Sequence, residues 1–111
     1  MSITWIAPDF AVSPQLRVEQ LSEIAAAGYC GIVNNRPDRE GPDQPTSDAI
    51  EAEARLLGLD YAYIPIAPGE MSEAHVRALE RFLQQVEGPV LAFCRTGNRS
   101  AQLWKLAREA A

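Results

Sequence analysis

One stretch decides how this chain is expected to fold: residues 90–100, with the sequence VLAFCRTGNRS. Its first four residues are apolar and rich in strand formers, so they predict a buried β-strand. The strand leads into a short polar loop that starts at Cys94 and holds one glycine and two arginines. From Ser100 to about residue 110, apolar residues recur at helical spacing. A strand, a loop and a helix in this order predict an α/β fold with Cys94 at the carboxyl end of its strand.

Outward from this stretch, the chain alternates candidate strands and helices. Ser13 followed by Pro14 is typical of a helix cap and a first helical residue, and Gly28 would end that helix. We expect two further helices, one capped by Thr46 or Ser47 and one capped by Ser72, ending at Gly58 and Gly88. The expected strands before the last one span 3–6, 10–12, 29–34 and 60–66, with a polar loop at 35–45. This order predicts one domain with a mostly parallel central sheet flanked by helices.

Composition narrows the class of protein. A chain of 111 residues has room for a single core. Its net charge of −5 argues against nucleic acid and against an anionic membrane surface as partners. No apolar run approaches the roughly 20 residues that span a bilayer, and residues 1–10 do not resemble a signal peptide. The two cysteines form no disulfide framework and no metal-ligand pattern, so we expect a cytoplasmic protein with no metal and no cofactor.

The Cys94 loop combines a nucleophile with an anion site. Backbone N–H groups of a tight loop and the start of a helix attract negative charge, which lowers the pKa of a thiol there. Arg99 can offer a planar pair of N–H donors to an oxyanion. We therefore expect Cys94 and Arg99 to be catalytic and a small anion to be the substrate. The other loop residues are expected to bind that anion: Arg95, Thr96, Gly97, Asn98 and Ser100.

A second segment is expected to meet the loop at the same edge of the sheet. Asn34 and Arg36 follow the strand at 29–34, and ligands bind beyond the carboxyl ends of parallel strands. Both side chains could widen the anion site. The alternative is structural, with Arg36 paired to an acidic residue and Asn34 bound to loop backbone.

The loop at 94–100 resembles the active-site loop of rhodanese-type sulfurtransferases and the signature loop of cysteine-dependent phosphatases. With residues 34–38 (NNRPD) and 63–66 (YIPI), the whole chain resembles one family more closely. That family is the phosphatase-like domain found alone or attached to beta-lactamase-like persulfide dioxygenases in bacteria. The resemblance covers about Trp5 to Trp104 and implies that residues 1–111 form one domain with a cysteine-phosphatase-like fold, often in sulfide metabolism, with a persulfide dioxygenase as a partner.

The loop and its surroundings favour sulfur chemistry over phosphate chemistry. Four residues separate Cys94 from Arg99, the rhodanese count, whereas cysteine phosphatases have five. Phe93 stands where the phosphatases carry histidine. No carboxyl group stands where related phosphatases have their general acid; Glu70 and Asp43 are the nearest candidates, with Glu73 and Asp38 as substitutes.

Three hypotheses follow. The first is a rhodanese-like sulfurtransferase that moves sulfane sulfur from thiosulfate or a persulfide through a Cys94 persulfide. The alternative is a dual-specificity-like phosphatase, a hydrolase that cleaves a phosphoester through a Cys94 phosphoenzyme. The third is a non-catalytic carrier or sensor of persulfide or oxyanion.

The remaining candidates have structural explanations. Cys30 is expected to be a small core residue, with a resolving thiol for Cys94 as the alternative. His75, the only histidine, is expected at the surface. Trp5 and Trp104 are expected in the core or at an interface.

Overall fold

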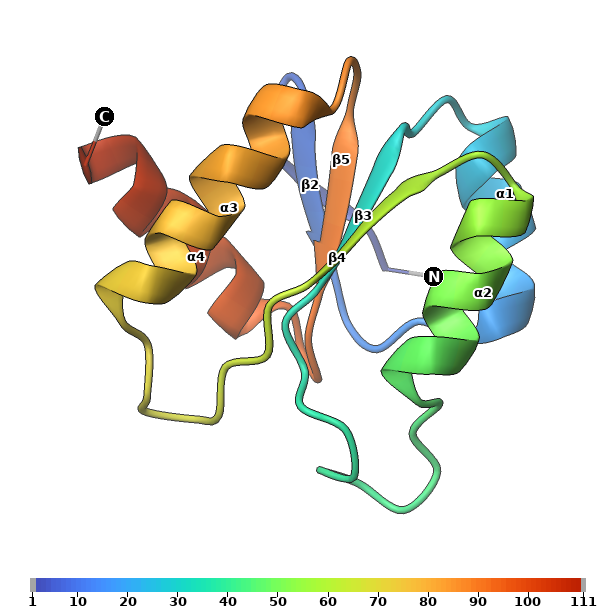
Figure 1. The fold of residues 1–111 in the computed structure, drawn as a ribbon, viewed down its shortest axis with the longest axis horizontal. Coiled ribbons are helices and arrows are strands. Elements are labelled where there is room, and N and C mark those ends of the chain that lie inside the picture. The colour runs from blue at the N-terminus through green and yellow to red at the C-terminus, as the bar shows by residue number, and fades with distance from the viewer. Residues whose placement is uncertain (1, 111) are drawn as a thin grey trace.

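The structure, a computed structural model, describes residues 2–110. Its sheet has the strand order β1-β2-β5-β3-β4, and Figure 1 shows it between two layers of helices. The pairs β2–β5, β5–β3 and β3–β4 are parallel, and β1 pairs with β2 antiparallel. The expected mostly parallel sheet is therefore confirmed. The strands are β1 Thr4–Ala7, β2 Phe10–Ser13, β3 Gly31–Asn34, β4 Asp60–Tyr63 and β5 Val90–Phe93.

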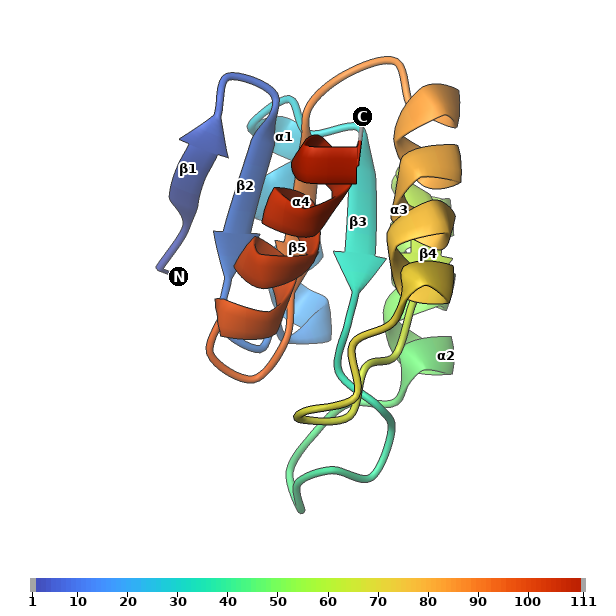
Figure 2. The same cartoon turned by 90° about the vertical axis from the view of Figure 1, so that its left-hand side faces the viewer.

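The helices cover both faces of this sheet, as Figures 1 and 2 show. The side chains of β5 pack alternately into two hydrophobic cores, one on each face of the sheet, because successive residues of a strand point to opposite faces. Val90 and Ala92 pack in the cluster that includes residues of α3 (Glu73–Gln85) and α4 (Asn98–Ala110). Leu91 and Phe93 pack in the cluster that includes residues of α1 (Leu21–Ala26) and α2 (Ser47–Leu56). The helical segments are the 3₁₀ helix η1 Val18–Gln20, α1 Leu21–Ala26, α2 Ser47–Leu56, α3 Glu73–Gln85 and α4 Asn98–Ala110.

The first expected helix begins later than the sequence predicts. Ser13 is the last residue of β2 and pairs with Phe93, so the expectation that it caps a helix is wrong. Its hydroxyl donates to the Pro14 carbonyl instead. The local signal of a serine before a proline is overridden by strand pairing with β5, and regular helix starts only at Leu21.

Smaller differences concern strand and helix ends. Pairing covers only 31–34 and 60–63 of the strands expected at 29–34 and 60–66. The last helix begins at Asn98, so Arg99 lies in its first turn rather than before it. Trp5 is 52% exposed and stacks on Tyr29, so it is not a core residue. Trp104 is half-buried and stacks on Phe10.

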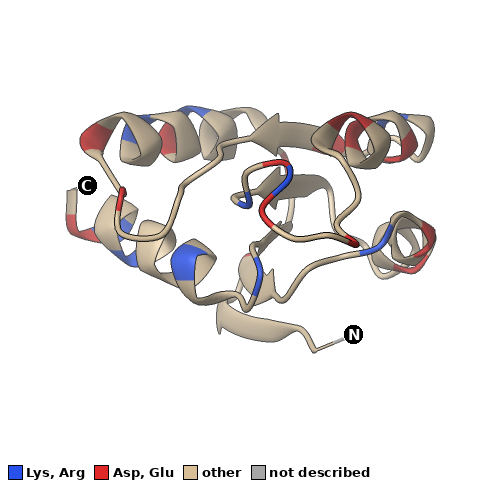
Figure 3. Cartoon of the chain, turned by 90° about the horizontal axis from the view of Figure 1, so that it is seen from below, with Lys and Arg blue, Asp and Glu red and all other residues tan. Residues whose placement is uncertain are grey.

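The four parallel strands end side by side. Ser13 and Asn34 each pair with Phe93, and Asn34 pairs with Tyr63. The loops that follow these strands therefore share one edge of the sheet, seen from below in Figure 3. The expected meeting of residues 34–36 with the Cys94 loop occurs at this edge.

Cys30 lies at the opposite end of the parallel strands, where they begin. It directly precedes β3, whose first residue pairs with Val90 at the start of β5, whereas Cys94 follows the end of β5. Four residues of strand span about 13 Å, and a disulfide needs Cα atoms within about 7 Å. The alternative that Cys30 resolves a Cys94 intermediate within the same chain is therefore wrong. Across residues 2–110, no helix is long and apolar enough to cross a membrane.

Candidate active site

Cys94 lies at the base of the loop between β5 and α4, with none of its surface exposed. The backbone N–H of Gly97 donates to Cys94 Sγ at 3.1 Å. Burial raises the pKa of the Cys94 thiol, but hydrogen bonds from the backbone N–H groups of Ser100, Thr96, Gly97 and Arg99 outweigh it. The net effect is a lowered pKa, because these N–H groups stabilise the thiolate.

The loop is held open by a glycine and by contacts from the segment after β2. Gly97 has a φ of 97° and its carbonyl accepts the first hydrogen bond of α4, from the Ala101 N–H at 3.0 Å. A Cβ at Gly97 would lie 3.4 Å from the Ser13 backbone. On the other side, the Gln15 N–H donates to the Arg95 carbonyl at 3.2 Å. The loop is thus hydrogen-bonded at Arg95 to the segment after β2 and packs closely against Ser13 at Gly97.

Gly97→Ala is expected to destabilise the fold by about 1–2 kcal/mol, because a side chain is strained at positive φ. It is also expected to raise the Cys94 pKa, since the strained loop releases N–H groups from the sulfur. Denaturant unfolding and the thiolate absorbance measure the two effects. Gly28→Ala is the matched control, because Gly28 has a φ of 99° and open space around it. Equal effects of both variants on the Cys94 pKa would contradict this role of Gly97.

The lowered thiol pKa has a consequence for stability. A group with a lower pKa in the folded state stabilises the fold above its unfolded pKa, and this contribution is lost as the pH falls through its folded pKa. Wild type is therefore expected to lose stability relative to Cys94→Ser as the pH falls through the folded pKa of Cys94. Chemical unfolding of both proteins across neutral and mildly alkaline pH measures this. A constant difference between them over that range would contradict the lowered pKa.

Arg99 points its guanidinium at both the thiol and a carboxylate. Its Nη1 donates to Glu40 Oε2 and to the Ile66 carbonyl, both at 2.8 Å, and its Nη2 donates to Glu40 Oε1 at 2.8 Å. The hydrogen bond to Glu40 is the main cause of a raised Arg99 pKa, and Cys94 adds to it. Of the five N–H groups of an arginine, three are thus bound to protein. The remaining pair, Nε–H and one N–H of Nη2, lies side by side and suits an oxyanion.

Glu40 accepts from a second arginine. Arg36 Nε donates to Glu40 Oε1 at 2.9 Å, and Arg36 Nη1 donates to Gln15 Oε1 at 3.0 Å. Hydrogen bonds from Arg99, opposed by burial and supplemented by Arg36, lower the Glu40 pKa to about 2. Arg36 is buried, with 8% of its surface exposed, and its side chain is committed to these protein partners.

Asn34 is also bound to protein. Its side-chain amide donates to the Tyr61 hydroxyl at 3.1 Å, and its side-chain oxygen accepts from the Arg36 N–H at 2.9 Å. Asn34 is thus bound to loop backbone and Arg36 is paired with the acidic residue Glu40, as the structural alternative predicts.

Ser100 connects the start of α4 to β3. Its hydroxyl donates to Asn35 Oδ1 at 2.8 Å, and the Asn35 side-chain N–H donates to the Ile64 carbonyl at 2.9 Å. Ser100 thus interacts with the thiol through its backbone N–H and with Asn35, the residue after β3, through its hydroxyl.

Three loop residues are exposed at the mouth of the site: Arg95, Thr96 and Asn98. The Thr96 hydroxyl accepts from the Asn98 N–H at 3.3 Å. Both acid candidates, Glu70 and Asp43, are exposed on the segments after β4 and before α2. Among residues 2–110, no group of three or more His, Cys, Asp or Glu side chains is placed to hold a metal ion.

Sequence reasoning missed Glu40, Gln15 and Asn35 as parts of the site. Asn35 stands beside Asn34 at a strand end, so its position carried a signal. Glu40 and Gln15 carry none, because their contacts depend on how two irregular loops cross.

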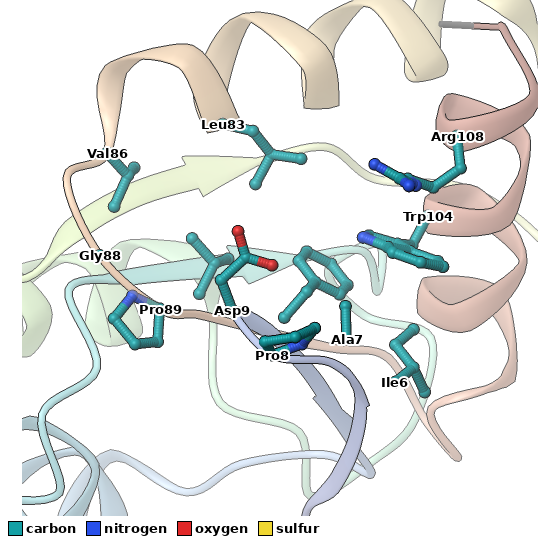
Figure 4. A pocket seen from close by; sticks show the side chains of 12 residues that line it. Ile6, Ala7, Pro8, Asp9, Leu83, Val86, Gly88, Pro89, Trp104 and Arg108 are labelled. Carbon is teal, nitrogen blue, oxygen red and sulfur yellow. The ribbon is translucent and has the colours of Figure 1, made fainter.

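A separate pocket of about 540 Å³ lies at the other edge of the sheet. Figure 4 shows Asp9 and Arg108 among the apolar side chains that line it, including Trp104. Val90, the first residue of β5, also lines it, whereas Cys94 follows the last one. This pocket is therefore not part of the Cys94 site.

The sequence matches a known protein family and several of its curated members. Residues 2–111 match the family described as "Beta-lactamase hydrolase-like protein, phosphatase-like domain". A beta-lactamase hydrolase-like protein of Xylella fastidiosa (strain Temecula1) is 37% identical over 107 residues, which are 96% of this chain and 25% of that protein. One from Agrobacterium fabrum is 34% identical over 95 residues, covering 86% of this chain and 22% of that protein. The chain thus spans about a quarter of the length of these relatives.

Solved structures share the fold. A candidate phosphatase of Neisseria meningitidis, nma1982, has a TM-score of 0.87 at 33% identity, covering 97% of this chain and 77% of that chain. The catalytic domain of the PP-IP phosphatase Siw14 of S. cerevisiae has a TM-score of 0.71 at 18% identity, covering 96% and 64%. The expected cysteine-phosphatase-like fold is confirmed.

The descriptions of these relatives support the hypotheses drawn from the sequence to different degrees. None of them is described as a sulfurtransferase, so sulfur transfer, the first hypothesis, gains no support. The phosphatase alternative is better supported. A persulfide dioxygenase as partner gains no support from them either.

Proposed function

Because this chain belongs to the family of phosphatase-like domains of beta-lactamase hydrolase-like proteins, we propose that it hydrolyses a phosphate monoester through a Cys94 phosphoenzyme. One observation carries the proposal. A buried thiol with a lowered pKa faces four backbone N–H groups and Arg99, two of whose N–H donors are bound to neither Glu40 nor Ile66. A nucleophile and an oxyanion site thus share one loop.

In the first step, Cys94 Sγ attacks phosphorus as the thiolate. The S–P bond forms, the bond from phosphorus to the ester oxygen breaks, and its electron pair leaves with that oxygen. The N–H groups of the loop and the side-by-side pair of Arg99 hold the three other oxygens of the phosphoryl group. Because these donors are fixed before the substrate binds, they need little rearrangement during the reaction.

In the second step, water attacks the phosphorus of the Cys94 phosphoenzyme. The S–P bond breaks, inorganic phosphate is released, and the thiolate returns to the N–H groups that stabilise it. Glu70 and Asp43 are the candidates for giving a proton to the leaving oxygen in the first step and taking one from water in the second. Glu40 is not, because a carboxyl group with a pKa of about 2 holds no proton near neutral pH.

The short loop does not argue against this chemistry. The four-residue spacing predicts a cradle too tight for a phosphoryl group. Yet the Gly97 N–H donates to the Cys94 sulfur at 3.1 Å, and the N–H groups of Thr96, Arg99 and Ser100 also lower the pKa of that thiol. A convergent set of N–H donors is what a phosphoryl oxyanion needs, and the exposed Arg95, Thr96 and Asn98 side chains are left to contact the rest of the ester.

The test uses the purified chain and intact mass. With p-nitrophenyl phosphate we expect steady release of the phenol and, after rapid acid quenching, an adduct of about 80 Da. A parallel incubation with thiosulfate tests sulfur transfer, whose adduct would be one sulfur atom, about 32 Da. A stable sulfur adduct without phosphatase turnover would overturn the proposal. Absence of both adducts and of turnover would also overturn it and would leave the non-catalytic oxyanion sensor as the remaining hypothesis.

A further inference from the structure

Glu40 is the only carboxylate on residues 2–110 that forms ion pairs with two arginines. Its Oε1 accepts from Arg99 Nη2 at 2.8 Å and from Arg36 Nε at 2.9 Å, and its Oε2 accepts from Arg99 Nη1 at 2.8 Å. Only 20% of its side chain is exposed. A residue 59 positions before Arg99 therefore binds the outer end of that guanidinium.

We propose that Glu40 is a positioning residue that orients Arg99 so that its remaining pair of N–H donors faces the anion bound above Cys94. This inference rests on the proposed function and adds a residue to it. Glu40 takes the two N–H groups at the end of the guanidinium, and the Ile66 carbonyl takes a third. A planar group held at three N–H positions cannot rotate, so the direction of the other two is fixed.

The segment that carries Glu40 is itself fastened. The Asp38 N–H donates to the Tyr63 hydroxyl at 2.9 Å, and Asp38 Oδ1 accepts from the Ser47 N–H at 2.8 Å. Arg39 has a φ of 63°, an uncommon conformation for a residue with a side chain. A backbone held in this way delivers the next residue, Glu40, in one orientation. In Figure 3 this charged loop lies in front of the strand ends, and Figure 1 shows that it projects below them.

Gly41 adds to the same arrangement. A Cβ at Gly41 would lie 2.7 Å from Arg36 Nη2, too close for both to stay in place. Glycine here lets Arg36 lie against the loop while it binds Glu40. Arg36 thus acts on the site through Glu40, because its own side chain is bound to Glu40 and Gln15.

A simpler role for Glu40 would be to balance the charge of the two arginines. The two roles predict opposite effects on Cys94. If Glu40 only supplies negative charge, Glu40→Gln removes a charge that disfavours the thiolate, and the Cys94 pKa falls. If Glu40 holds Arg99, the glutamine loses the two-oxygen contact, Arg99 moves off the sulfur, and the Cys94 pKa rises.

The experiment compares Glu40→Gln with wild type and with Glu51→Gln. Glu51 is the matched control, since it pairs with Arg55 on the exposed face of α2 at 2.7 Å. Three readouts are taken: the Cys94 pKa from thiolate absorbance, the affinity for inorganic phosphate by calorimetry, and kcat and KM for p-nitrophenyl phosphate. Absorbance of Cys94→Ser is subtracted to remove the signal of Cys30.

Glu40→Gln is expected to raise the Cys94 pKa and to weaken phosphate binding about tenfold. It should lower kcat/KM by more than tenfold, because the Arg99 N–H donors would no longer be oriented toward the phosphoryl oxygens of the transition state. Glu51→Gln should match wild type. A Cys94 pKa that falls or stays constant, or unchanged phosphate affinity, would overturn the positioning role. If Glu40→Gln does not fold, Glu40→Asp replaces it: the shorter side chain keeps the charge but loses the two-oxygen contact, so positioning predicts a raised Cys94 pKa and weaker phosphate binding, and wild-type values would overturn it.

The two proposals fail separately. If wild type shows no phosphatase turnover, the proposed function fails, while the pKa and phosphate-binding readouts still decide the role of Glu40. If wild type turns over substrate and Glu40→Gln keeps its pKa, affinity and rate, only the positioning role fails.

Discussion

Replacing Cys94 with serine is expected to lower kcat/KM for phosphate-ester hydrolysis by at least about a thousandfold. A serine hydroxyl in the same place carries no charge near neutral pH, and the single histidine of the chain, His75, lies in the first turn of α3. The four N–H groups that favour a thiolate are not sufficient to ionise an alcohol. Steady-state kinetics with p-nitrophenyl phosphate, at enzyme concentrations high enough to detect residual turnover, measure the loss.

Binding separates this loss from damage to the site. Cys94→Ser removes a negative charge from the bottom of the anion cradle, so inorganic phosphate should bind as tightly as in wild type or more tightly. Cys30→Ser is the matched control, because Cys30 lies at the other edge of the sheet. We expect it to retain the wild-type rate. Turnover by Cys94→Ser within about tenfold of wild type would mean that another group is the nucleophile.

Much of the fold was predictable because its signals are local. The apolar run 90–93 is buried on both faces, and its alternate residues enter two different cores, which is typical of a central parallel strand. The cysteine that follows it lies where parallel sheets carry their sites. Position in the chain was therefore enough to predict that Cys94 and Arg99 lie together at the carboxyl ends of the strands.

The predictions that failed came from local sequence signals that tertiary contacts override. Ser13 and Pro14 form a good helix start in isolation, yet Ser13 completes the parallel pairing with β5. Glu40 gave no signal because its contact with Arg99 joins residues far apart in sequence through an irregular loop. The loop length favoured sulfur chemistry, whereas the family match and the solved structures support the phosphatase alternative better.

The second large effect is expected for Arg99→Lys, which should lower kcat/KM by about a hundredfold to a thousandfold although the positive charge is kept. A lysine ammonium is a point charge with three donors. It cannot bind both Glu40 oxygens and the Ile66 carbonyl while offering two parallel N–H groups to a phosphoryl group. The two parallel N–H donors of Arg99 stabilise the non-bridging phosphoryl oxygens most strongly in the transition state. We therefore expect kcat to fall by a larger factor than KM rises.

Arg55→Lys is the matched control for this substitution. Arg55 also pairs with a glutamate, Glu51, but on the exposed face of α2, so its replacement should leave kcat and KM unchanged. If Arg99→Lys keeps more than about a third of the wild-type kcat/KM, then charge alone at this position suffices and planarity is unimportant. Glu40 would then have no orientation to maintain, since a point charge has none. The outcome for Arg99 thus decides whether the carboxylate beneath it is part of the catalytic geometry or only of the charge balance.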